Sequence, residues 1–270
     1  MTQLSKIKNV FISAGVLWYR NGVDYISAAV SYYTIFALVP LIFISVHVVS
    51  ILYGEEYTIA VMQEWGTGLG SGIVNLLQEA VQNLDTLSYP TYLPYAGLFV
   101  VFSALLVWLN TIANGLHRLF GQKSSGVKAY FKRSFYALVF LVFLEMSIIS
   151  LIALEFFVAL TGSISNLLFS VVYIFFWTIL SAISYSLLSM DNHPPLFSRL
   201  LGGFVASLLF ILGQSLVGLY VFSSTIPNIF DRAGLILVLL LWVYANASIY
   251  YFGASFSQAH SEIFSKLNNK

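Results

Sequence analysis

The chain has 270 residues, of which 59% are hydrophobic and 9% are charged. A soluble domain carries roughly 25% charged residues, so this composition excludes a water-soluble globule and indicates an integral membrane protein. The net charge of +1 gives no general attraction to nucleic acid, and the lack of cysteine excludes disulfides, thiolate metal sites and cysteine nucleophiles.

Residues 4–20 form a basic, amphipathic segment whose apolar stripe includes Leu4, Ile7, Phe11 and Trp18. Such a segment is expected to lie as a helix in the inner membrane interface. The start of the chain lacks a long apolar core and a cleavage site, so no removable signal peptide is expected. The first transmembrane helix is predicted over about residues 25–53.

The first predicted span contains small residues over 27–31, then Tyr32 and Tyr33, and then a fully apolar run that includes Pro40. Small residues at helical spacing let a neighbouring helix approach closely in lipid. This pattern indicates tight helix packing. The alternative is that Tyr32 and Tyr33 face a pathway or a ligand.

The segment 54–90 is acidic and contains no lysine or arginine. A glycine-rich break at residues 67–72 divides it into two amphipathic pieces, which predicts an external helical hairpin that could shield a cavity. Five further spans are predicted at about residues 92–116, 134–160, 163–188, 197–222 and 235–258. The expected fold is therefore an all-α bundle of six transmembrane helices, forming a single integral membrane domain over residues 1–270.

The basic residues orient this predicted bundle. With six spans, eleven of the twelve lysines and arginines fall on one side, and Arg232 lies opposite. The positive-inside rule then places both termini in the cytoplasm.

Polar side chains within the predicted spans are the candidate site residues, because each is costly in lipid unless it is paired or hydrated. Glu145 is expected near the middle of the third span, about 17 Å from its cytoplasmic end, and to face the bundle interior. Either this carboxyl group is protonated and bonded to a neighbouring helix, or it lies in a hydrated cavity. The other candidates for a cavity or pathway are His47, Asn110, Asn114, Glu155, Gln214, Arg232 and Asn246, with Tyr32 and Tyr33. For the asparagines, hydrogen bonding between helices is the alternative role.

No pattern typical of catalysis is present in the sequence. The four histidines, His47, His117, His193 and His260, are scattered and form no HExxH or clustered metal-binding pattern. No serine lies in a GxSxG pattern, and the glycines at 68–72 lack P-loop spacing. We therefore expect neither an enzyme nor a resident cofactor or metal.

Two stretches resemble the YihY/BrkB family, whose members were once labelled ribonuclease BN-like. They are AAVSYYTIFALVPLIF (Ala28–Phe43) and GLILVLLLWVYANASIYYFGASFSQA (Gly234–Ala259). Where many members have Glu and Asn after the glycine-alanine of the second stretch, this chain has Ser255, Phe256, Ser257 and Gln258. The resemblance implies a bacterial plasma-membrane protein with an envelope function, and it implies no particular substrate.

Three functions remain open at this point. The first is a transporter or flippase-like protein for an amphipathic or lipid-linked envelope molecule, with membrane lipids as partners and no nucleic acid. The second is a structural or scaffolding protein that recruits partners through the basic loop at residues 117–133. The third is a membrane-bound hydrolase, including a ribonuclease, for which the expected site geometry is missing. The oligomeric state does not follow from the sequence.

Overall fold

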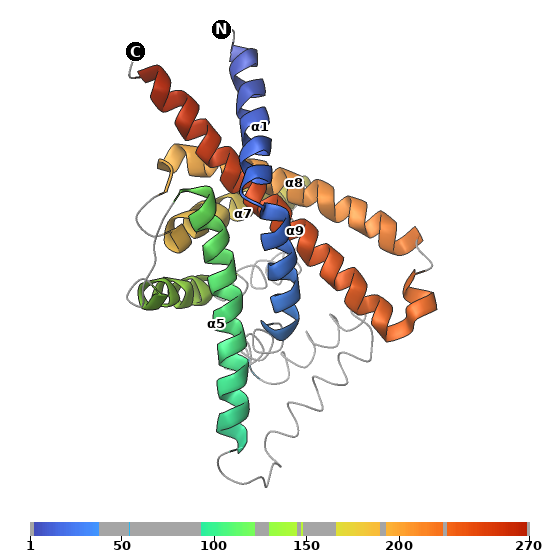
Figure 1. Ribbon diagram of the computed structural model, residues 1–270. Coiled ribbons are helices and arrows are strands. Elements are labelled where there is room, and N and C mark those ends of the chain that lie inside the picture. Colours follow the sequence, from blue (N-terminus) through green and yellow to red (C-terminus); the bar gives the residue numbers. More distant parts are fainter. Residues whose placement is uncertain are drawn as a thin grey trace. The chain divides into compact units, whose positions relative to one another are not determined.

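The structure is a computed structural model that describes residues 3–37, 54, 93–121, 130–144, 147, 166–189, 193–223 and 226–268 (Figure 1). Within these ranges the regular structure is entirely helical, which confirms the all-α prediction. The chain divides into two compact units, residues 1–35 with 106–270 and residues 36–105. In the second unit the structure describes 36–37, Gly54 and 93–105, so the predicted outer hairpin lies outside the described residues.

The N-terminal helix α1 comprises Gln3–Arg20, as expected, and ends in a glycine turn. The amide of Asn21 bonds to the Leu17 carbonyl at 3.1 Å, and the amide of Gly22 bonds to the Tyr19 carbonyl at 3.1 Å. Gly22 has a φ of 63°, a left-handed conformation that glycine adopts without strain. The turn lets a second helical segment start at once, over residues 23–37.

Three later helices lie close to their predicted positions. α5 (Leu93–Leu119), α7 (Asn166–Ser189) and α8 (Leu196–Ser223) correspond to the predicted spans at 92–116, 163–188 and 197–222. Residues 193–195 between α7 and α8 are not helical, as the adjacent prolines Pro194 and Pro195 predict. Residues 130–144 are also helical, and they include the turn that precedes the predicted start of the third span at 134.

The last helix extends beyond both ends of the predicted last span, 235–258. α9 has 43 residues and comprises Ile226–Asn268. At about 1.5 Å per residue it is roughly 65 Å long, about twice the ~30 Å hydrocarbon layer. The helix begins at Ile226, before the predicted span, and Pro227 is its second residue, where a missing amide proton costs no intrahelical bond.

The helices α7, α8 and α9 pack on one another through glycines. A Cβ atom placed on Gly203 of α8 would lie 2.5 Å from the Thr178 carbonyl oxygen of α7. One placed on Gly202 would lie 2.3 Å from the Gly253 carbonyl oxygen of α9. The two helices on either side of α8 are therefore in direct backbone contact with it, which is the packing that small residues allow in lipid.

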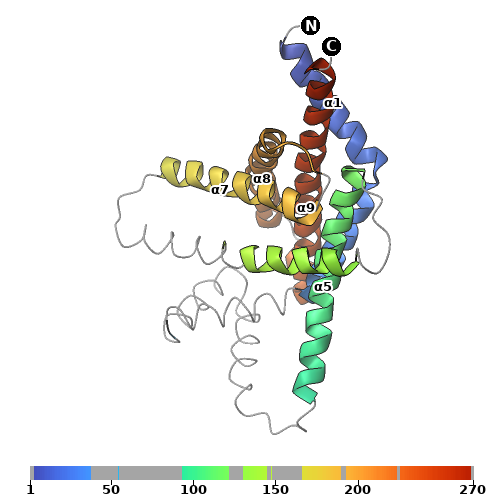
Figure 2. The ribbon, with the colours of Figure 1, turned by 90° about the vertical axis from the view of Figure 1, so that its left-hand side faces the viewer.

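α1 packs against the C-terminal part of α9. Val10 and Ala14 are buried and form a core with Phe256 and Ala259 of α9. At the other end of α1, the Trp18 indole Nε1 donates to the Ser248 carbonyl at 3.2 Å. Because residue numbers rise on α1 as they fall on α9, the pair is antiparallel, and both termini lie at the same end of it (Figure 2).

The predicted apolar stripe of α1 is covered by α9 only in part: the centroid of the Phe11 ring lies 4.9 Å from that of the Phe256 ring and Trp18 bonds to Ser248, whereas Ile7 is open. Ile7 is 56% exposed and Phe11 is 44% exposed, whereas Val10 and Ala14 are buried. α1 therefore has two apolar faces, one covered by α9 and one open, which remains available to a membrane interface.

The described residues contain three helical stretches that are long and apolar enough to cross a membrane: Val171–Ser189, Leu196–Gly213 and Leu237–Ser265. They correspond to the fourth, fifth and sixth predicted spans. The first and third predicted spans continue into parts of the chain outside the described residues. Six transmembrane helices therefore remain a prediction.

Candidate functional site

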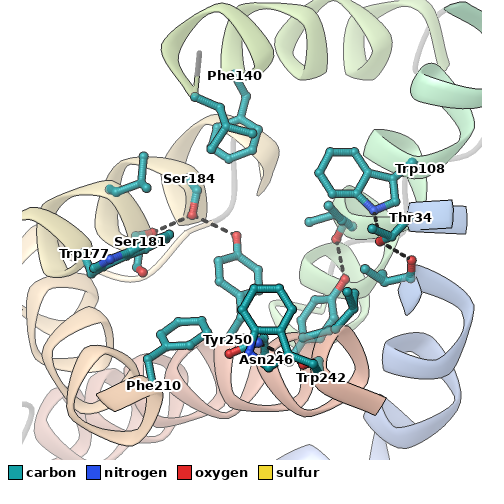
Figure 3. A pocket seen from close by; sticks show the side chains of 17 residues that line it. Thr34, Trp108, Phe140, Trp177, Ser181, Ser184, Phe210, Trp242, Asn246 and Tyr250 are labelled. Atoms are coloured by element: carbon teal, nitrogen blue, oxygen red, sulfur yellow. Dashed lines mark hydrogen bonds between the residues drawn. The ribbon is translucent and has the colours of Figure 1, made fainter. Parts of the chain in front are cut away.

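A cavity of about 300 Å³ lies within the larger unit, between six helical segments (Figure 3). Its walls come from the segment 23–37, α5, the segment 130–144, α7, α8 and α9. The larger unit thus brings together side chains that lie more than 200 residues apart in the sequence, such as Val30 and Tyr251.

Seven of the seventeen residues that line the cavity are aromatic. Trp108 comes from α5, Trp177 from α7, Phe210 from α8 and Trp242 from α9, and Phe140 closes the side formed by the segment 130–144. The rings of Trp177 and Phe210 lie 5.7 Å apart, tilted by 38°. Apolar walls with a few polar groups are typical of sites for small organic ligands, and they favour hydrocarbon over a free sugar or ion.

A hydroxyl pair forms the main polar feature of this wall. The hydroxyl oxygens of Ser184 on α7 and Tyr250 on α9 lie 2.8 Å apart. Ser184 Oγ donates to the Ser181 carbonyl at 2.8 Å. Since serine has a single hydroxyl proton, Tyr250 must donate in the pair. The remaining lone pair of Tyr250 is thus an acceptor that this wall can offer to a ligand.

Two indole groups on the wall differ in their bonding. Trp108 Nε1 donates to Thr34 Oγ1 at 2.8 Å, and Thr34 Oγ1 donates to the Val30 carbonyl at 2.7 Å. Trp177 Nε1 is buried and has no hydrogen-bond partner among the described residues. A buried donor without a partner is costly, and it marks the Trp177 side of the cavity as a place for an acceptor.

Asn246 is the predicted site residue that the structure places in this cavity. It is half-buried on α9 between Trp242 and Tyr250 (Figure 3). Its side-chain nitrogen donates to the Trp242 carbonyl at 2.8 Å, one turn earlier in the same helix. The amide is therefore oriented by its own helix, which leaves the amide oxygen for other contacts.

The tyrosine pair predicted as a possible pathway lies elsewhere. Tyr32 is 56% exposed, Tyr33 is half-exposed, and neither lines the cavity. Their rings meet edge to edge, with centroids 5.4 Å apart. Thr34, the next residue, lines the cavity instead.

Asn110 and Asn114 also lie outside the cavity and contact the segment 130–144. Asn110 Nδ2 donates to the Leu106 carbonyl at 2.9 Å and lies 3.3 Å from Ser134 Oγ. Arg133 Nη1 donates to Asn114 Oδ1. Hydrogen bonding between helical segments, the alternative role for these asparagines, is therefore the one observed.

The other predicted site residues cannot be placed. Glu145, Glu155 and His47 lie outside the described residues. Gln214 is on α8 and Arg232 is on α9, and the structure describes their backbone but not their side chains. The prediction that Glu145 faces the bundle interior stays a prediction.

The tryptophans that line the cavity were not among the site residues predicted from the sequence. Three of the five tryptophans, Trp108, Trp177 and Trp242, line the cavity. Tryptophan in membrane proteins is enriched at the membrane surfaces, where its N–H can meet water. Trp108 and Trp177 instead lie well inside their predicted spans, and that position was the signal that could have indicated an internal site.

The closest arrangement to a catalytic pair is a serine–histidine contact between α8 and α9. Ser198 Oγ and His260 Nδ1 lie 2.9 Å apart. Ser198 is 4% exposed, and the His260 ring stacks on Phe264 with centroids 4.3 Å apart. This burial suits a contact that joins two helices better than a nucleophile that must reach a substrate. Among the described residues no group of three or more acidic or histidine side chains could hold a metal ion.

Comparison with known proteins decides the family. The model of the family described as Virulence factor BrkB matches residues 18–269. The chain belongs to the BrkB family. This match confirms the resemblance seen in the two sequence stretches and extends it over nearly the whole chain. No curated protein and no solved structure matches the chain.

Proposed function

We propose that this BrkB-family protein moves an amphipathic or lipid-linked molecule of the bacterial envelope within or across the inner membrane, without converting it chemically. The observation that carries the proposal is the aromatic cavity, which Trp177, Phe210 and Trp242 line in a chain of membrane-spanning character. Aromatic walls suit hydrocarbon chains, since burial of apolar surface is the main source of affinity there.

The polar groups of the cavity support an amphipathic ligand over a purely apolar one. The unpartnered Trp177 Nε1 and the second N–H of the Asn246 amide can each donate to a polar linkage such as an ester or a phosphate, and the Tyr250 hydroxyl oxygen can accept from a hydroxyl group. A dry, fully apolar cavity would contain none of these groups. A ligand with a chain and a polar head uses both kinds of wall.

The test is lipid movement in proteoliposomes that contain the purified full chain. The probe is fluorescent phosphatidylglycerol, and dithionite quenches the label in the outer leaflet. We expect the wild-type protein to make inner-leaflet label accessible faster than protein-free vesicles do. Rates equal to those of protein-free vesicles, together with no binding of the labelled lipid to the protein, would contradict the proposal and favour a scaffold.

A cavity-filling variant tests whether the movement uses this site. Ala247 lines the cavity and is 9% exposed. Ala247→Phe places a ring in the space and is expected to reduce lipid movement to the protein-free rate. Ala245→Phe is the matched control, since Ala245 is on the same helix, two residues away, and does not line the cavity. Equal loss in both variants would assign the effect to helix packing instead.

A further inference from the structure

A second polar cluster lies at the C-terminal end of α5, on the face opposite the cavity. Asn110, Asn114 and His117 are spaced by four and three residues, so they share one side of the helix. Arg133, at the start of the described segment 130–144, contacts this side through Asn114. None of these residues lines the aromatic cavity.

Two polar atoms of this cluster, the Oδ1 atom of Asn110 and the Nε atom of Arg133, are buried and have no partner among the described residues. The ring of His117 interacts with the Leu188 backbone. His117 is 5% exposed and Asn110 is 6% exposed. Most buried polar atoms in proteins are hydrogen-bonded, and each one left unpaired is costly. The Nε atom of Arg133 is the unpaired donor that carries positive charge, and it requires an acceptor.

The charge of the cluster indicates the sign of that group. Within the described residues, the Arg133 guanidinium bonds to the neutral amide of Asn114 and pairs with no carboxylate. Burial and the nearby Arg133 charge lower the pKa of His117, against the hydrogen bond to the Leu188 backbone, so its ring adds no positive charge to the cluster. An anion would compensate the half-buried Arg133 cation and its unpaired N–H group.

We propose that Arg133, with Asn114 and His117 behind it, forms a binding site for a phosphate group. The guanidinium presents N–H donors in a planar fork that matches phosphate oxygens, and Asn114 holds one end of this fork in place. Arg133 directly precedes the third predicted span, at the level where lipid headgroups lie. Basic pockets between helices at that level commonly bind anionic headgroups, so a lipid phosphate is the expected source. The site does not depend on the proposed transport function.

The experiment measures binding to the purified full chain by native mass spectrometry, with phosphatidylglycerol in one arm and inorganic phosphate in the other. We expect Arg133→Gln to weaken phosphatidylglycerol binding by about tenfold, the loss of one charge-assisted contact. Arg118→Gln is the matched control, since it removes the same charge from an exposed residue at the end of α5. It should change binding by less than about twofold.

The two arms distinguish the source of the phosphate. Binding of phosphatidylglycerol alone identifies a lipid site, and binding of inorganic phosphate with the same dependence on Arg133 identifies a site for a soluble phosphate. Wild-type binding of both probes by Arg133→Gln would overturn the proposal.

Hydrogen exchange of the wild-type protein gives a test that does not depend on folding of the variant. Phosphatidylglycerol should protect residues 110–118 and 130–136, and phosphatidylcholine, which has no net negative charge, should protect them less. Equal protection by both lipids, or no protection by either, would also overturn the proposal.

Discussion

Gly253 of α9 and Gly202 of α8 lie in backbone contact where the two helices cross. A Cβ atom placed on Gly253 would lie 2.6 Å from the Gly202 carbonyl oxygen, 2.6 Å from the Tyr185 hydroxyl and 2.7 Å from Ala206 Cβ. Tyr185 is fully buried, and its hydroxyl donates to the Tyr250 carbonyl at 2.8 Å. This crossing therefore joins α7, α8 and α9 and sets the position of Tyr250 in the cavity wall.

Gly253→Ala should lower the free energy of unfolding by about 1–3 kcal/mol, the usual cost of inserting a methyl group into a packed contact. The carbonyl of Gly202 is backbone and cannot move aside as a flexible side chain would. Thermal unfolding in detergent, followed by tryptophan fluorescence, measures the change. The chain contains five tryptophans but no cysteine for thiol-reactive dyes.

Gly15→Ala is the control for this substitution. Gly15 is within α1, and a Cβ atom there would meet nothing within 4 Å. Alanine is favoured over glycine inside a helix by about 1 kcal/mol, so this variant should be unchanged or more stable. A stable Gly253→Ala protein would mean that α8 and α9 do not cross as described.

Gly115 of α5 and Tyr251 of α9 provide a second test of packing around the cavity. A Cβ atom on Gly115 would lie 2.5 Å from the Tyr251 ring, and the Tyr251 hydroxyl donates to the Ile112 carbonyl at 3.1 Å. Tyr251→Phe keeps the ring and loses this bond, at a cost of about 0.6 kcal/mol, the average for such bonds in membrane proteins. Gly115→Ala must displace a fully buried ring and should cost about 1–3 kcal/mol. The reverse order in thermal unfolding would contradict this contact.

Much of the fold follows from the sequence because membrane helices have strong local signals. Apolar runs long enough to cross a membrane predict α7 and α8, and Pro194 and Pro195 predict the break between these helices. The bounds of α9 could not be predicted in the same way. Its polar C-terminal part is helical because Ala259 and Ile263 pack on α1, and that contact joins opposite ends of the chain.

The candidate site was less predictable than the fold. The cost of a polar side chain inside lipid indicates Asn246, which lines the cavity, but it gives no signal for Trp108 and Trp177, whose large apolar rings are also typical of packing residues. Helical spacing alone could not decide that Thr34, rather than Tyr33, turns inward. That orientation depends on the bond from Trp108, which lies 74 residues further along the chain.

Both chain termini should lie on the same side of the membrane. α1 is antiparallel to the C-terminal part of α9, and Val10 lies near Ala259 whereas Trp18 bonds to the Ser248 carbonyl. The positive-inside rule predicts that this side is cytoplasmic. Green fluorescent protein and alkaline phosphatase fusions at each end measure the location. Both fluorescent fusions should be bright and both phosphatase fusions inactive, and opposite results at the two ends would contradict the helix pair.

The stability of the protein should fall as the pH falls below about 6.5, and His117 should contribute to this fall. Burial of His117 and, to a smaller extent, the positive charge of Arg133 lower its pKa from the usual 6.5. A hydrogen bond to the Leu188 backbone raises the pKa but does not cancel the other two effects. The unfolded chain therefore binds a proton at a higher pH than the folded chain does, and stability rises with pH through this window. The contribution of His117 is complete above pH 6.5 and is lost as the pH approaches its lower, folded-state pKa.

Thermal unfolding of the wild type and of His117→Gln between pH 8 and pH 5 isolates this residue, because other histidines titrate equally in both proteins. The wild type should lose more stability than the variant on acidification, and parallel curves would show that His117 is not buried beside Arg133 as described.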